Sequence, residues 1–176
     1  MNAADHPLHE LFQACRQGLA GAVRSVLGPS ADVPEVLQDA FLKAWPQWQQ
    51  GTRPNDPRAW IFVITWNAAK DARRRRQRRP PHETLDEGTH VALVTHPSPT
   101  HALEQREAVD RAQAAVAELA DGEQQVFLLR VAGELTFEAI AEQLAIPVGT
   151  AKTRMRAALA KLRTSLGAGD TKESTR

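Results

Sequence analysis

The chain has almost no cysteine and no long hydrophobic run. Its 176 residues include a single cysteine, Cys15, which excludes an intrachain disulfide and fits a reducing compartment. No apolar stretch approaches the roughly 20 residues that a membrane-spanning helix needs. The first residues also lack the basic segment followed by an apolar one that marks a secretory signal. We therefore expect a cytoplasmic protein without membrane insertion.

Residue patterns typical of catalysis are missing as well. The sequence has no nucleophile–base pair, no phosphate-binding loop and no cluster of metal ligands. Four histidines fall in or beside one proline-containing segment, but their spacing matches no zinc pattern and no cysteine is near; they are His82, His90, His96 and His101. We expect no enzyme, no metal site and no other cofactor.

Charge is nearly balanced overall but strongly patterned along the chain. The net charge is +1, yet residues 53–79 carry nine Lys/Arg and two Asp. Residues 83–142 carry twelve Asp/Glu and three Arg, and residues 152–163 carry five cations and no acid. Two basic segments separated by an acidic one indicate two nucleic-acid contacts on one protein. We hypothesise that the acids of residues 83–110 shield the basic surfaces in the free protein.

The most distinctive segment is a helix predicted for residues 56–79. Asp56 is suited to be its N-cap and Pro57 to occupy its first turn, while Pro80 and Pro81 end it. Four-residue spacing predicts a core-facing stripe of Trp60, Ile64, Ala68 and Ala72. A second stripe alternates aromatic or apolar and basic side chains: Phe62, Val63, Trp66, Lys70 and Arg73.

The end of this helix is dominated by arginine, which occupies six of the seven positions 73–79. Guanidinium groups bind phosphates, and flat rings stack on unpaired bases. We therefore predict a helix that grips single-stranded or opening nucleic acid, although a solvated helix end is the alternative. For Trp66, core packing and base stacking are both left open.

Two amphipathic helices are predicted before this segment. Residues 8–27 repeat apolar side chains every three or four positions, which predicts one amphipathic helix. Gly18 and Gly21 are the positions at which that helix could break. A second helix begins at Asp32, which matches a capping box in charge and spacing, and Pro46 is expected to end or kink it near Trp45. Three packed helices ending at residue 79 predict a small all-α domain.

The C-terminal half predicts a helix-turn-helix after a linker. Residues 80–102 are proline-containing and aperiodic, which is typical of a flexible linker. Thr136 is suited to cap a short helix, a tight turn follows at residues 145–147, and a longer basic helix begins at Val148. Side chains expected to reach bases or phosphates in the major groove are Thr150, Lys152, Thr153, Arg154 and Arg156. A generic helix pair with a solvated basic face is the alternative, and residues 167–176 are expected to be a disordered tail.

In combination, these motifs resemble the small bacterial sigma factors of the extracytoplasmic-function group of the sigma-70 family. EVLQDAFLKAW (residues 35–45) is similar to the family's helix that binds core RNA polymerase. RAWIFVITWNAAKDARRRR (58–76) is similar to the helix that melts and holds the promoter −10 element. LTFEAIAEQLAIPVGTAKTRM (135–155) is similar to the helix-turn-helix that reads the −35 element.

The resemblance implies an all-α protein of two small domains, at residues 1–79 and 103–166, that brings core RNA polymerase to promoter DNA. It also makes an anti-sigma protein a plausible further partner, and association with the nucleoid when the chain is bound to polymerase. Polymerase contacts are expected at Glu35, Gln38, Asp39 and Leu42. Contacts with the single-stranded −10 element are expected at Phe62, Trp66, Asn67, Lys70, Asp71, Arg73, Arg74 and Arg76. Contacts with the duplex −35 element are expected at Thr136, Val148, Thr150, Lys152, Thr153, Arg154 and Arg156.

The chain also departs from the family pattern. Val63 and Trp66 stand where the family often has arginine, which makes the −10 surface less electrostatic and better suited to stacking. Ala145 stands where a glycine commonly makes the turn. Two other functions remain open: a helix-turn-helix regulator that binds duplex DNA without polymerase, and an RNA-binding protein that uses the arginine run.

Overall fold

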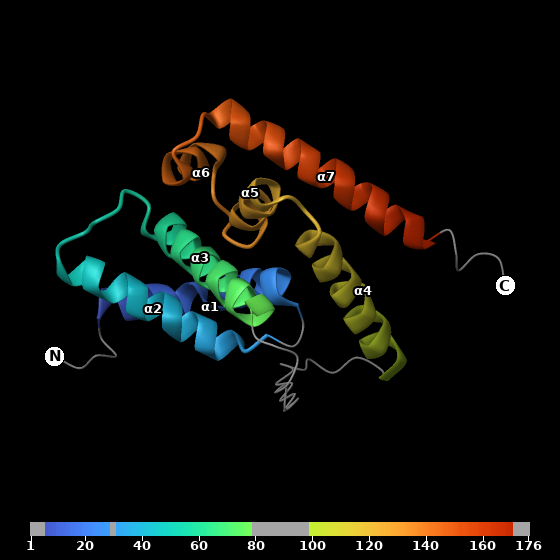
Figure 1. Cartoon of the computed structure of the whole chain (residues 1–176), viewed down its shortest axis with the longest axis horizontal. Helices are drawn as coiled ribbons and strands as arrows, with labels where there is room; N and C mark the ends of the chain where they lie inside the picture. Colours follow the sequence, from blue (N-terminus) through green and yellow to red (C-terminus); the bar gives the residue numbers. More distant parts are fainter. Residues whose placement is uncertain (1–5, 29–30, 79–98, 171–176) are drawn as a thin grey trace.

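The protein is built from α-helices. A computed structural model describes residues 6–28, 31–78 and 99–170, and within these ranges it has seven α-helices and no strand. We refer to α1 (Pro7–Leu27), α2 (Val33–Gln49) and α3 (Pro57–Arg78) as the first domain. We refer to α4 (Pro99–Ala117), α5 (Asp121–Val131), α6 (Phe137–Leu144) and α7 (Val148–Asp170) as the second domain. The predicted all-α class is confirmed (Figure 1).

Local capping contacts determine where two helices of the first domain begin. The Asp32 carboxylate accepts a hydrogen bond from the Glu35 N–H (3.0 Å), and the Asp56 carboxylate accepts one from the Ala59 N–H (2.9 Å). Each carboxylate satisfies an N–H that has no partner within the first helical turn, so it stabilises the start of the helix. Both predicted caps are confirmed.

Pro46 lies in the last turn of α2 and does not end the helix. We expected it to end or kink the helix near Trp45, and the expected end is wrong because α2 continues to Gln49. The Trp45 ring contacts the His6 ring at a tilt of 54°, with centroids 4.5 Å apart, and Trp48 packs against the core. These contacts on both sides of Pro46 offset the cost of about 3 kcal/mol that an internal proline carries.

Helix α3 is buried on more than one side. The predicted core stripe holds for Ile64 and Ala68, while Trp60 and Ala72 are half-buried. Other positions are also buried: Ala59, Ile61, Phe62, Thr65, Ala69 and Lys70. Figure 1 shows the reason, because α3 lies between α1 and α2 on one side and α5 and α6 on the other.

The second domain has the predicted helix-turn-helix. The Thr136 hydroxyl oxygen accepts a hydrogen bond from the Ala139 N–H (3.1 Å) and starts α6. Ala145 ends α6 in the left-handed conformation (φ 50°, ψ 44°), at the position where the family commonly has glycine. Because this conformation favours glycine, alanine there costs about 1 kcal/mol. The small side chain of Ala141 in α6 is buried.

Two boundaries differ from those expected. Helix α7 continues to Asp170, so the prediction of a disordered tail is wrong for residues 167–170. Helix α4 begins at Pro99, inside the segment predicted as linker. The rest of the predicted linker, with its three histidines, and the last six residues lie outside the described residues.

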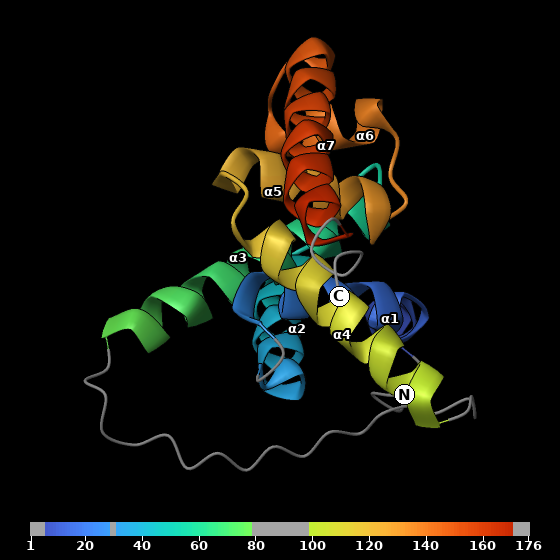
Figure 2. The same ribbon diagram turned by 90° about the vertical axis from the view of Figure 1, so that its right-hand side faces the viewer.

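The two domains pack directly against each other. α3 contacts α5 and α6, and α1 contacts α4, as the two views in Figures 1 and 2 show. The two domains approach each other closely at Gly18 of α1, where an added Cβ would lie 2.4 Å from the carbonyl oxygen of Ala132 and 3.0 Å from Cζ of Phe62. α1 runs unbroken through Gly18 and Gly21, and at Gly18 only a glycine allows this approach.

Candidate nucleic-acid and polymerase surfaces

The surface predicted to bind polymerase lies on α2. Burial of Val36, Ala40 and Ala44 directs the opposite face of the helix outward. On that face Glu35 and Gln38 are exposed, and Leu42 is 59% exposed. Asp39 is half-buried and accepts a hydrogen bond from Arg75 of α3 (3.0 Å). The surface thus combines an exposed aliphatic side chain with polar neighbours.

A second ion pair joins the same two helices. Asp71 of α3 accepts a hydrogen bond from Lys43 of α2 (2.8 Å), and Arg74 approaches it at 3.7 Å. The hydrogen bond from Lys43 is the main reason that the pKa of Asp71 is lowered from its ordinary value. Asp71 therefore remains ionised and links α2 to α3 within the first domain.

The residues predicted to contact the −10 strand do not all lie on one surface. Asn67, Arg74 and Arg76 are exposed, and Asp71 is partly exposed. Phe62 is only 2% exposed, so its expected place on an accessible stripe is wrong. Period counting from one core stripe misplaced Phe62 because α3 has neighbours on two sides.

Trp66 and Lys70 lie beside each other on the side of α3 that faces the second domain. Trp66 is half-buried, and the Lys70 ammonium lies 5.6 Å from the centroid of its ring. Lys70 is only 5% exposed. A lysine is rarely buried to this degree without a charged partner.

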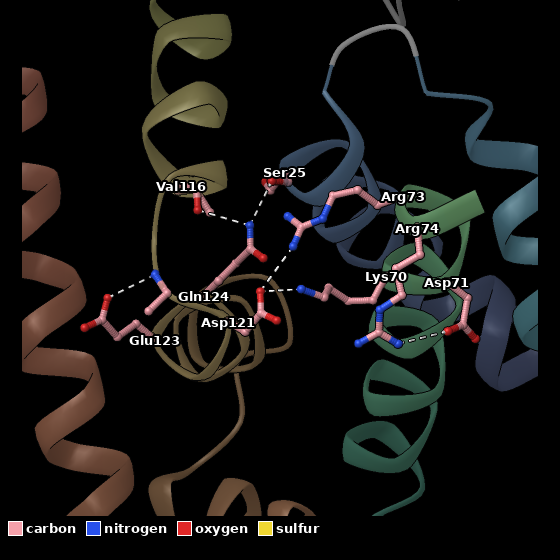
Figure 3. A network of polar contacts seen from close by, with 10 residues as sticks. Ser25, Lys70, Asp71, Arg73, Arg74, Val116, Asp121, Glu123 and Gln124 are labelled. Atoms are coloured by element: carbon pink, nitrogen blue, oxygen red, sulfur yellow. Dashed lines mark hydrogen bonds and ion pairs between the residues drawn. The ribbon is translucent and has the colours of Figure 1, made fainter. Parts of the chain in front are cut away.

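That partner is Asp121, at the start of α5 (Figure 3). Its Oδ1 accepts hydrogen bonds from the Lys70 ammonium and from the Arg73 guanidinium, the latter at 3.1 Å. The bond from Lys70 is the largest of the effects that lower the pKa of Asp121. One carboxylate of the second domain thus holds two cations that were predicted to bind DNA.

The first turn of α5 makes further polar contacts around Asp121 (Figure 3). Gln124 is fully buried, and its amide donates to the carbonyl oxygens of Ser25 (3.2 Å) and Val116 (3.1 Å). The Ser25 carbonyl has no helical donor four residues on, because that position is Pro29, which has no N–H. Gln124 therefore supplies the donor that the end of α1 lacks.

Two more contacts cross the domain boundary. Arg58 at the start of α3 donates to Glu134 (3.0 Å), which precedes α6. Asn55 donates to Glu142 of α6 (2.8 Å). Sequence reasoning identified none of these acids, nor Asp121, as functional.

The acidic segment of the sequence predicted that acids would lie against the basic helix, but not which acids. The shielding acids were expected within residues 83–110, but most of that range lies outside the described residues. Within it, Glu107 and Asp110 are exposed. The acids of this segment that contact α3 come later, at Asp121 and Glu134, and Glu142 contacts Asn55 in the loop before α3.

The predicted reading surface of the helix-turn-helix is partly accessible. Lys152, Thr153 and Arg156 are exposed, and the Thr153 hydroxyl donates to the Gly149 carbonyl (2.9 Å). Thr136 is exposed and caps α6, while Val148 and Thr150 are half-buried.

Arg154 differs from these residues because it lies against α5. A Cβ added to Gly122 would lie 3.1 Å from its Cζ. In this arrangement Arg154 is only partly available to DNA.

The described residues contain no group of three or more His, Cys, Asp or Glu side chains placed to hold a metal ion. None of their helices is both long and apolar enough to cross a membrane. Cys15 is free and buried, and burial raises the pKa of its thiol.

Comparison with known families matches both domains. The family model of sigma-70 region 2 matches residues 11–79, and that of sigma-70 region 4 matches residues 110–162. The RNA polymerase sigma factor HrpL of Pseudomonas syringae pv. syringae is 25% identical over 132 residues, which cover 75% of this chain and 72% of the relative. The ECF RNA polymerase sigma-E factor of Escherichia coli (strain K12) is 29% identical over 136 residues, which cover 72% of this chain and 70% of the relative.

Solved structures agree in fold. CnrH in complex with the cytosolic domain of CnrY matches with a TM-score of 0.65 and 26% identity, over 92% of this chain and 88% of that one. The sigma factor RpoE in complex with the anti-sigma factor NepR from Bartonella quintana matches with a TM-score of 0.65 and 19% identity, over 90% and 95%.

The two matched regions stand in the family's order and include the basic helix α3 and the helix-turn-helix. The relatives align across both domains rather than across the helix-turn-helix alone. The chain belongs to the extracytoplasmic-function group of the sigma-70 family, whose members direct RNA polymerase to promoters.

Proposed function

We propose that three helices of this sigma factor divide the work of promoter recognition. α2 binds core RNA polymerase, α3 holds the single-stranded −10 element, and α7 reads the −35 element. The observation that carries the proposal is that one chain has both the basic, tryptophan-containing α3 and the helix-turn-helix, each within a matched sigma region. A regulator that only binds duplex DNA would have no use for α3.

The polymerase contact is assigned to the exposed face of α2. Leu42 supplies an apolar anchor, and Gln38 and Asp39 supply hydrogen-bonding groups around it. Interfaces commonly place such an anchor within a polar rim. Because Asp39 pairs with Arg75, polymerase binding at this face would also change the contacts of the arginine-rich end of α3.

The DNA contacts use different chemistry in the two domains. On α3, Trp66 is assigned to stack on an unpaired base and the nearby cations to bind phosphates. On α7, Lys152, Thr153 and Arg156 are assigned to the major groove. The second contact gains effective concentration from the first, because both belong to one chain.

The chain itself catalyses nothing in this proposal, since the core polymerase supplies the chemistry. We place its action in the cytoplasm, on the nucleoid when polymerase is bound. The matched structures of CnrH and RpoE hold CnrY and the anti-sigma factor NepR, respectively. We propose a protein partner of the anti-sigma class for this chain as well.

Size-exclusion chromatography with purified bacterial core RNA polymerase tests the polymerase contact. The test variant is Gln38→Ala, Asp39→Ala, Leu42→Ala, and we expect it to lose the co-elution that the wild-type chain shows. A matched control removes one exposed glutamine, aspartate and aliphatic residue elsewhere: Gln13→Ala, Val109→Ala, Asp110→Ala. If the wild-type chain does not co-elute at micromolar concentration, the sigma mechanism fails for this chain and binding to duplex DNA alone becomes the better reading.

A further inference from the structure

One face of the DNA-binding helix is covered by the second domain. Asp121 holds Lys70 and Arg73, Glu134 holds Arg58, and Glu142 holds Asn55. These contacts follow α3 and the loop before it from residue 55 to residue 73. Each of the three acids belongs to α5, α6 or the segment between them, so the acidic side of the second domain lies along the basic side of α3.

The covered face is not fully satisfied by this packing. Among the described residues, the Trp66 indole N–H, the Arg58 Nε–H and the Gln124 amide oxygen are buried without a hydrogen-bond partner. Each of these groups has lost its hydrogen bonds to water and has not replaced them. The packed arrangement therefore leaves polar groups of this face unsatisfied, and a different partner could use the indole N–H and the ring of Trp66.

We propose that the Asp121 carboxylate occupies the place on Lys70 and Arg73 that a phosphate of the promoter strand takes, so that the packed domains mask the −10-binding face. The proposal rests on the function assigned above to α3. A carboxylate and a phosphodiester are both anions that accept hydrogen bonds from ammonium and guanidinium groups. They exclude each other here because Lys70 is 5% exposed once Asp121 is in place.

Masking has a quantitative consequence. If only a fraction of the molecules has the domains apart, the apparent affinity for single-stranded DNA is reduced by that fraction. Any change that separates the domains should raise this affinity even though it adds no contact with DNA. Core polymerase would have the same effect if it holds the two domains apart.

Two variants separate the domains by unrelated means. Asp121→Asn removes the charge that pairs with Lys70 and Arg73. Gly18→Ala changes no charge but places a methyl group 2.4 Å from the Ala132 carbonyl oxygen, where the two domains are in contact. Neither residue belongs to a surface that we assign to DNA or polymerase.

Each variant has a matched control. Glu118→Gln removes one exposed carboxylate just after α4, outside residues 83–110, and makes the same change in net charge. Gly21→Ala is the same substitution in the same helix, and an added Cβ there meets nothing within 4 Å. Circular dichroism shows whether all four variants keep their helices.

Two measurements on the full-length chain without polymerase test the proposal. Small-angle X-ray scattering gives the radius of gyration. Fluorescence anisotropy gives the affinity for a fluorescein-labelled single-stranded DNA of mixed sequence, about 12 nucleotides long, at low ionic strength. We expect Asp121→Asn and Gly18→Ala to expand the chain and to tighten DNA binding about fivefold or more, because apparent affinity follows the open fraction. Both controls should match the wild type.

Each contrary result has a definite meaning. If the two variants expand the chain but do not tighten DNA binding, the covered face is not a DNA site and the proposal is wrong. If they keep their helices, remain compact and bind DNA as the wild type does, Asp121 does not hold the domains together and the proposal is also wrong. Co-elution of the same variants with core polymerase tests the proposed function separately, because masking does not involve the α2 surface.

Discussion

Replacing Gln124 tests how strongly the buried polar contact between the domains stabilises the fold. Its amide donates to two carbonyl oxygens, one of them on Ser25 in the other domain. The Val116 carbonyl also accepts from the Leu119 N–H (3.2 Å), so it keeps a partner when Gln124 is lost. The residue four positions after Ser25 is a proline, which has no N–H, so the Ser25 carbonyl loses the donor that Gln124 provides.

The magnitude can be estimated for Gln124→Leu, which nearly conserves volume. Leaving the Ser25 carbonyl unsatisfied costs about 1–3 kcal/mol, and the lost bond to Val116 costs about 1 kcal/mol. Removing the unpartnered amide oxygen stabilises the folded chain by about 1 kcal/mol or more. We therefore expect Gln124→Leu to lower the free energy of unfolding by about 1–3 kcal/mol. Gln124→Ala should cost about 2 kcal/mol more, because it also leaves a cavity.

Urea unfolding followed by circular dichroism at the helix band measures both free energies. A loss of about 2 kcal/mol corresponds to a melting temperature lower by about 4–8 °C in a chain of this size. The difference between the unfolding free energies of the two variants gives the cost of the cavity separately from the cost of the lost hydrogen bonds. If Gln124→Leu is as stable as the wild type, the amide contributes no net stability and the reasoning from the Ser25 carbonyl is refuted.

Three other changes test separate parts of the structure. Trp66→Ala should weaken binding of single-stranded DNA about 5- to 150-fold, the equivalent of about 1–3 kcal/mol for one stacked base; a melting temperature far below that of the wild type, with DNA binding unchanged, would instead identify Trp66 as a core residue. Ala145→Gly should raise the free energy of unfolding by about 1 kcal/mol, because glycine adopts the left-handed conformation without strain; thermal unfolding that does not change would contradict this. Acid should separate the domains. The pKa of Asp121 is lowered in the folded chain, so the stability that its ion pairs contribute is present above the ordinary value of 3.8. That stability is lost as the pH falls through the lower pKa of the folded chain. Scattering at descending pH should show expansion in that acidic range for the wild type, while Asp121→Asn should be expanded already at neutral pH; a wild-type chain that stays compact in acid would exclude this role for Asp121.

Several sequence-based expectations were correct because they depend on neighbours within one turn. The caps at Asp32, Asp56 and Thr136 each join a side chain to an N–H three residues later. The tight turn predicted at residues 145–147 is also local, and Ala145 adopts the left-handed conformation there. Such contacts need no knowledge of the rest of the fold.

The errors arose where tertiary packing outweighs local preference. α2 continues past Pro46 because aromatic contacts hold its last turn, and no local pattern reveals those contacts. Phe62 was expected on an accessible stripe but is buried, because α3 is covered on two sides. A periodic pattern shows that a helix has a buried face but not how many neighbours it has.

The sequence by itself determined the helices, the helix-turn-helix and the family, because caps, apolar spacing and runs of charge depend only on residues that are close together in the chain. Only the tertiary structure decided which charged groups meet. Asp121 and Lys70 are 51 residues apart in the chain, and Asn55 and Glu142 are 87 apart. Their pairing depends on how the two domains pack, down to the single glycine at residue 18 that lets α1 approach the carbonyl of Ala132. Charge patterning indicated that acids would shield the basic helix, but the choice of acids required the three-dimensional arrangement.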